Sequence, residues 1–199
     1  MIFDENHYLS NFVNIRNKTP IIMLKKLSIT AFALLLLTSC DAVDELTKFD
    51  LDYTTNYTIE SNTIIDTPLD IITPEVTTNS ETEFESNDTR KDLIESIKLK
   101  TMTLTLKSPS DGNFNFINEI SIYIKAEGLA EQIIASGIDL PENGAQQLTL
   151  GVDNVELKEY IKKDSYSLRV NTVTDGAITR DHNIDIRTVF RVDAKILGI

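Results

Sequence analysis

The sequence predicts an all-β protein, an antiparallel β-sandwich that is immunoglobulin-like or related, with one or two short connecting helices. Two observations predict this fold: apolar residues recur with a period of two, and helix-like stretches are few and short. Alternation gives each strand one apolar and one polar face, as in antiparallel sheets that are buried on one side. Two such sheets facing each other form a sandwich.

Four stretches carry the alternation, at residues 49–60, 101–107, 119–126 and 183–196. The last is the longest, and it places Phe190 toward the core and Val189 toward the outside. The inward members of the four stretches are Phe49, Leu51, Tyr53, Tyr57 and Ile59; Met102, Leu104 and Leu106; Ile120, Ile122, Ile124 and Ala126; and Ile184, Ile186, Thr188, Phe190, Val192, Ala194 and Ile196.

Helix signals are confined to short connections. Thr89 to Asp92 has the spacing of a capping box ahead of Leu93, which predicts one or two turns leading into a strand at Lys98. A second helix is predicted to open at residues 153–156, because two lysines in its last turn would suit the helix dipole. Residues 129–135 fit either a helix or a strand.

A hairpin is predicted around Asp175-Gly176, a pair typical of tight turns. A two-residue loop would set Leu168 opposite Asn183, an apolar residue against a polar one on the same face. A loop of three or five residues, or a bulge, would set Leu168 opposite Ile184 instead. The sequence therefore predicts the longer connection.

Residues 25–40, KKLSITAFALLLLTSC, contain the long apolar run of the chain. The run from Leu27 to Leu37 has 11 residues, whereas a transmembrane helix needs about 20. A short apolar run behind two lysines is typical of a signal peptide.

The end of this run, Leu37-Thr38-Ser39-Cys40, resembles the lipobox of bacterial lipoproteins: an aliphatic residue, two small residues and then cysteine. The resemblance implies that Cys40 becomes the first mature residue and carries a thioether diacylglycerol and an amide-linked acyl chain. The acidic residues that follow partly resemble export signals of surface lipoproteins. As a whole, the chain resembles uncharacterised envelope lipoproteins of the Bacteroidota type, which implies an outer-membrane location and nothing catalytic.

The expected organisation follows from this leader. Residues 1–22 are acidic where a signal peptide should begin basic, so we expect them to be a non-native N-terminal extension ahead of Met23. Residues 23–39 are then the lipoprotein signal peptide, 40–48 the lipidated tether and 49–199 a single β-sandwich domain.

Net charge excludes one class of partner. The chain has a formal net charge of −12, and residues 1–39 contribute a net +2, so the mature part carries −14. Such a surface is repelled by phosphate backbones and anionic head groups, so we expect no nucleic-acid partner and attachment to the membrane only through lipid on Cys40.

Residues for enzymatic or metal chemistry are scarce. After Met23, His182 is the only histidine and Cys40 the only cysteine, so a hydrolase triad or zinc site lacks its residues. Glu81, Glu83 and Glu85 would share one face of a strand and are a weak calcium candidate, against the alternative of a charged edge that prevents aggregation. We expect no cofactor and no catalytic residues.

These observations predict a lipid-anchored cell-envelope protein acting as a non-catalytic binding or structural module for an envelope protein or glycan. One alternative is a lipid-binding or lipid-transfer module with an apolar cavity between its sheets. A carboxylate-based glycosidase ranks third, because aromatic residues make up only 7% and tryptophan is absent. Packing of the inward residues Leu104, Ile122, Leu168 and Phe190 distinguishes the first two.

Overall fold

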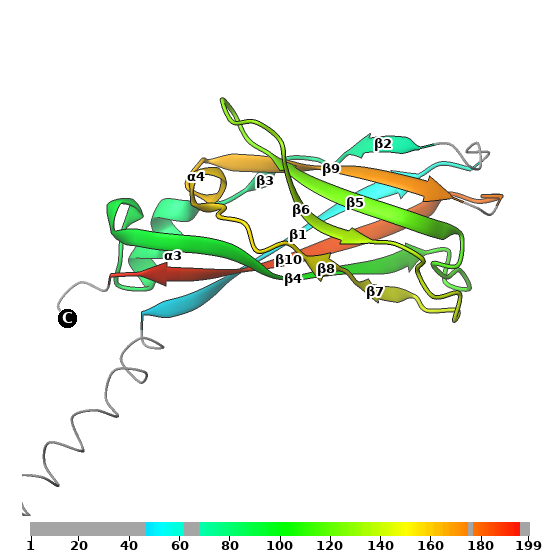
Figure 1. Cartoon of the computed structure of the whole chain (residues 1–199), viewed down its shortest axis with the longest axis horizontal. Helices are drawn as coiled ribbons and strands as arrows, with labels where there is room; N and C mark the ends of the chain where they lie inside the picture. Colours follow the sequence, from blue (N-terminus) through cyan, green and yellow to red (C-terminus); the bar gives the residue numbers. More distant parts are fainter. Residues whose placement is uncertain (1–46, 62–67, 175–176, 196–199) are drawn as a thin grey trace, which may run out of the picture. The chain divides into compact units, whose positions relative to one another are not determined.

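The computed structural model describes residues 47–61, 68–174 and 177–195, which form a sandwich of two antiparallel sheets (Figure 1). Sheet A has the order β1 (Lys48–Ile59), β10 (His182–Ala194), β4 (Ile94–Ser108) and β7 (Gln147–Thr149). Sheet B has the order β2 (Leu69–Ile72), β9 (Ser165–Thr174), β5 (Ile117–Lys125), β6 (Gln132–Gly137) and β8 (Gly151–Val152), and β3 (Val76–Thr77) also pairs with β9. The predicted all-β sandwich is confirmed.

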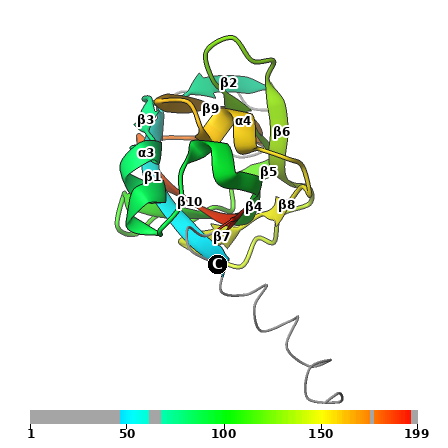
Figure 2. The same cartoon turned by 90° about the vertical axis from the view of Figure 1, so that its left-hand side faces the viewer.

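Three short helical segments connect the strands: α3 (Ser80–Ser86), the 3₁₀ turn η1 (Lys91–Leu93) and α4 (Lys158–Ile161). Figure 2 looks along the sandwich and shows the two sheets as layers, with α3 and β3 on the side where β1 lies. Within the described ranges, no helix has the length and apolar character needed to cross a bilayer.

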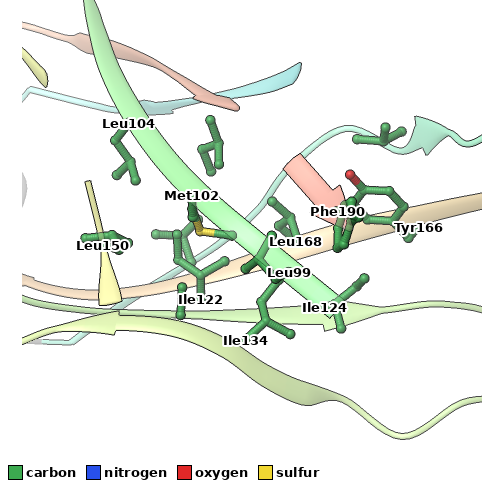
Figure 3. Close-up of a cluster of buried hydrophobic side chains, with 14 of the residues drawn as sticks. Leu99, Met102, Leu104, Ile122, Ile124, Ile134, Leu150, Tyr166, Leu168 and Phe190 are labelled. Carbon is green, nitrogen blue, oxygen red and sulfur yellow. The ribbon is translucent and has the colours of Figure 1, made fainter. Parts of the chain in front are cut away.

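The core lies between the sheets and is formed by the inward side chains of both. Leu104 from β4, Ile122 from β5, Leu168 from β9 and Phe190 from β10 are each 0% exposed and belong to one cluster (Figure 3). The described inward residues of all four predicted stretches are buried or pack against this cluster, so the predicted alternation is confirmed. Ile196 lies outside the described residues.

A bulge at Lys100 lets β4 keep its apolar residues in the core. Pairing with β10 shifts register between Leu99 and Thr101, which leaves Lys100 as the extra residue. The Nζ atom of Lys100 lies 2.6 Å from the carboxylate of Asp50 on β1. The inward residues are Ile97 and Leu99 before the bulge, and Met102, Leu104 and Leu106 after it.

The predicted hairpin between β9 and β10 is wrong. Leu168 on β9 pairs with Ile124 within sheet B, whereas Ile184 on β10 pairs with Leu106 within sheet A. The two strands therefore belong to different sheets, and the chain crosses between the layers after β9. The parity argument assumed that strands adjacent in sequence also pair, which a crossover does not require. Asp175-Gly176 lies outside the described residues.

Short helical segments form in both predicted connections, but their boundaries and caps differ from the prediction. Thr89 does not cap η1, because its hydroxyl donates to the carbonyl oxygen of Lys195 at 2.6 Å, and β4 begins at Ile94 rather than Lys98. The helix expected from residue 153 begins only at Lys158. Residues 129–135 fitted either a helix or a strand in the sequence. In the structure, residues 132–135 belong to strand β6 and the three residues before them lead into it.

Glu156 explains the late start of α4. Its Oε1 accepts hydrogen bonds from the backbone N–H groups of Ile97 at 2.8 Å and Lys158 at 2.9 Å. The N–H of Leu157 also donates to the carbonyl oxygen of Ile97 at 2.8 Å. These bonds hold the segment before α4 against β4, so its backbone is not free to form a helical turn.

Candidate functional site

The predicted face of three carboxylates does not form. Glu81, Glu83 and Glu85 lie on α3, not on a strand, and residues two apart on a helix point in different directions. Glu81 pairs with Lys91 at 3.5 Å. The prediction of a strand was wrong because α3 has a single large apolar residue, Phe84. One such residue cannot distinguish a strand period of 2 from a helix period of 3.6.

Within the described ranges, no three side chains of His, Cys, Asp or Glu lie close enough together to hold a metal ion. We therefore expect calcium to have little effect on stability. Thermal unfolding in chelator and in excess calcium should give melting temperatures within about 2 °C of each other, because a ligand stabilises only through a site in the folded state. A rise of about 10 °C with calcium would contradict this placement of the glutamates.

His182 starts β10 and points inward, as predicted, with 9% of its surface exposed. Its Nδ1 lies 2.8 Å from the carbonyl oxygen of Arg180, and its ring centroid lies 4.6 Å from that of Phe116. Because a carbonyl oxygen only accepts, Nδ1 carries the proton in this contact. The histidine thus ties the start of β10 to its preceding loop.

Three tyrosines pack at the core, with Tyr57 and Tyr166 buried and Tyr53 half-buried, and burial raises the pKa of each phenol. The hydroxyl of Tyr53 donates to the carbonyl oxygen of Thr78 at 2.8 Å, and that of Tyr166 lies 3.0 Å from the hydroxyl of Thr188. Tyr57 Oη, which is buried, has no hydrogen-bond partner among the described residues. Burial thus disfavours the phenolate form of each side chain.

The pKa values of carboxyl groups shift in the opposite direction to those of the tyrosines. Among the described residues, the carboxyl groups with shifted pKa values all shift downward; they are Asp70, Asp111, Glu156 and Asp181. A general acid in glycoside hydrolysis needs a carboxyl whose pKa is raised. The electrostatics of these groups are therefore those of hydrogen-bonded and ion-paired carboxylates.

The outer face of sheet B carries a cluster that we call the Arg169 surface, defined by Asp70, Ile72, Tyr123, Ile133, Arg169 and Asn171. Arg169 is its centre, since the strand register pairs it with Ile72 on β2 and with Tyr123 on β5. Tyr123 in turn pairs with Ile133 on β6. A row of apolar and planar groups therefore crosses four strands, and Ile72 at its end is 60% exposed.

Hydrogen bonds and ring contacts hold Arg169 in place. Its guanidinium lies 4.0 Å from the centroid of the Tyr123 ring, and it bonds Asp70 at 2.6 Å and Glu131 at 2.9 Å. Asn171 donates to Asp70 at 3.1 Å. Hydrogen bonds from Asn171 and Arg169 lower the pKa of Asp70, so the carboxylate stays charged.

Sheet A has a different outer face, occupied by ion pairs. Asp50 lies 2.6 Å from Lys100 and 3.0 Å from Arg191, and Asp52 pairs with Arg187. Exposed pairs of this kind contribute little to stability, about 0–1 kcal/mol each. These pairs join opposite charges on polar side chains, whereas the Arg169 surface has an exposed apolar side chain and a stacked aromatic ring.

Sequence reasoning found only part of the Arg169 surface. Alternation in residues 119–126 placed Tyr123 on the outer face of its strand. It could not place Arg169 beside Tyr123, because the pairing of β5 with β9 joins residues far apart in the chain. Cys40, the predicted lipidation site, lies outside the described residues.

No family model and no curated protein sequence matches the chain. Among solved structures, it is similar to one titled Desmodium yellow mottle tymovirus, at 10% identity and a TM-score of 0.28, covering 76% of this chain and 91% of that one. It is also similar to a decameric BFDV capsid protein, at 8% identity and a TM-score of 0.31, covering 74% of this chain and 99% of that one. At these TM-scores, the likeness carries no argument about what the chain does.

Proposed function

We propose that this protein is a lipid-anchored component of a bacterial cell envelope that acts as a non-catalytic binding or structural module. The anchor is lipid on Cys40 in the outer membrane, supported by the basic pair, short apolar run and lipobox of residues 25–40. Two or three acyl chains on one cysteine hold a protein at a membrane without a spanning helix, because each buried methylene contributes about 0.8 kcal/mol.

The Arg169 surface is the observation that carries the binding role. Ile72 offers exposed apolar area, the Tyr123 ring and the Arg169 guanidinium offer planar stacking surfaces, and Asp70 and Asn171 offer hydrogen-bonding groups. Tyrosine and arginine are enriched where proteins bind partners, since both combine apolar contact with directed hydrogen bonds. An envelope protein or a glycan matches this chemistry.

Core packing favours this function over a lipid-binding module. A lipid carrier needs an apolar cavity of several hundred Å³. Here Leu104, Ile122, Leu168 and Phe190 fill the space between the sheets, each with no exposed surface.

Site-specific photocrosslinking in living cells tests the binding role. We expect a photoreactive phenylalanine analogue in place of Tyr123 to give a discrete adduct, and Arg169→Ala in the same chain to reduce it. The analogue at Thr103, a half-buried residue on the outer face of sheet A, is the matched control and should give no such adduct. Protease digestion distinguishes a protein adduct from a glycan adduct.

Equal labelling from Tyr123 and Thr103, or none from a folded protein labelled at Tyr123, would contradict a binding role for the Arg169 surface. Circular dichroism of each purified variant establishes that it is folded.

A further inference from the structure

β1 is a long strand at the edge of sheet A. It has 12 residues and pairs with β10 alone within the described ranges. The other described strands with a single neighbour in the sheets have no more than four residues. A long edge strand presents unpaired backbone groups that can pair with another strand.

The backbone groups that face this edge can be identified from the ladder. The N–H of Ala194 donates to the carbonyl oxygen of Thr47 at 3.2 Å, and the register runs without interruption to the end of β1. Because hydrogen-bonding direction alternates along a strand, the odd-numbered residues bond to β10. The even-numbered residues therefore direct N–H and C=O away from the sheet; after Lys48 they are Asp50, Asp52, Thr54, Asn56 and Thr58.

These even-numbered residues are all exposed. Neighbouring segments contact the inward-pointing side chains of β1 instead. The ring of Phe84 on α3 lies 6.4 Å from that of Phe49, and the Tyr53 hydroxyl bonds the carbonyl oxygen of Thr78, which follows β3. These contacts cover the inward face of β1, and among the described residues no strand pairs with its outer edge.

Charge does not protect this edge. Natural edge strands often avoid pairing by carrying unpaired charges. The acidic groups here, Asp50 and Asp52, are already paired with cations on β4 and β10. Their pairing lowers the negative charge along this edge, although the chain as a whole stays acidic.

We propose that β1 pairs antiparallel with β1 of a second copy of this chain, about a two-fold axis at Thr54, so that sheet A continues across the dimer. In this register Asp52 lies opposite Asn56 and Asp50 opposite Thr58. No like charges of the strand face each other in this arrangement. The inward residues also match, with Leu51 opposite Tyr57.

Neighbouring registers fit less well. An axis at Asp52 sets two carboxylates against each other. An axis at Thr55 sets Asp50 against Glu60, and one at Asn56 sets Asp52 against Glu60. An axis at Tyr53 also avoids like charges, but it sets the inward side chain of Leu51 opposite the hydroxyl of Thr55 instead of the ring of Tyr57.

Sedimentation equilibrium of the full 199-residue chain in density-matched detergent tests the dimer. Wild type should dimerise, and Thr54→Lys should weaken association about five- to tenfold, because it places two ammonium groups opposite each other at the axis. Asn56→Lys should tighten association several-fold by facing Asp52 of the second copy. Thr149→Lys, on the opposite edge of sheet A, is the matched control and should leave association unchanged.

A wild-type chain that stays monomeric at every concentration overturns the proposal. Unchanged or tighter association of Thr54→Lys overturns the register, since an axis at Tyr53 would place that lysine opposite Asp52. Similar melting temperatures for all variants establish that the monomers remain folded. These outcomes do not depend on lipid at Cys40 or on the Arg169 surface, so failure here leaves the proposed function standing.

Discussion

Phe190→Ala is expected to lower the free energy of unfolding by about 3–5 kcal/mol, the cost of removing a buried aromatic side chain and leaving a cavity. Phe190 has no exposed surface, and its ring centroid lies 6.1 Å from that of Tyr53 and 5.9 Å from that of Tyr166. The three rings come from β10, β1 and β9, so they join both sheets. Urea unfolding followed by circular dichroism measures the loss.

Val189→Ala is the control, since it changes the adjacent residue on the opposite face of β10. Val189 is 8% exposed, yet it lies outside the core cluster, on the face where the ion pairs of sheet A run. We expect Val189→Ala to cost less than half as much as Phe190→Ala. Equal costs would contradict the register of β10.

Cys40→Ala is expected to abolish lipid attachment completely. In the proposed function, the thioether and the amino group of Cys40 carry all the acyl chains, and no other group replaces them. Radiolabelled palmitate should label wild type but not Cys40→Ala, and the variant should leave the detergent phase as an uncleaved or soluble product. Cys40→Ala protein that is labelled and partitions like wild type would contradict the lipobox interpretation.

Much of the fold could be predicted because alternation is a local property. A period of two identifies inward residues one strand at a time, and it placed Ile122, Phe190 and their neighbours correctly. It also placed His182 at an inward strand start. Long, regular stretches such as β10 offer many residues with which to fix the phase.

Features that depend on pairing could not be predicted in the same way. The crossover after β9 joins strands of different sheets, so Leu168 and Ile184 never meet. The Arg169 surface requires β2, β5 and β9 to assemble first. A bulge such as that at Lys100 is defined only by its partner strand.

The prediction for the short segment around Glu81, Glu83 and Glu85 was wrong for a different reason. α3 has seven residues and one large buried side chain, Phe84, so local pattern did not determine its period. The helix is defined by packing of Phe84 against Phe49 on β1, with ring centroids 6.4 Å apart. Tertiary contact therefore overrode an alternation of glutamates that resembles a strand.

Mass spectrometry of the N-terminal peptide from envelope-purified protein tests the central claim most directly. Lipid anchoring predicts a peptide that begins at Cys40, with a diacylglycerol on sulfur and an acyl chain on the α-amino group. A peptide that runs through Ser39 into Cys40, or an unmodified Cys40 in mature protein, would contradict the account.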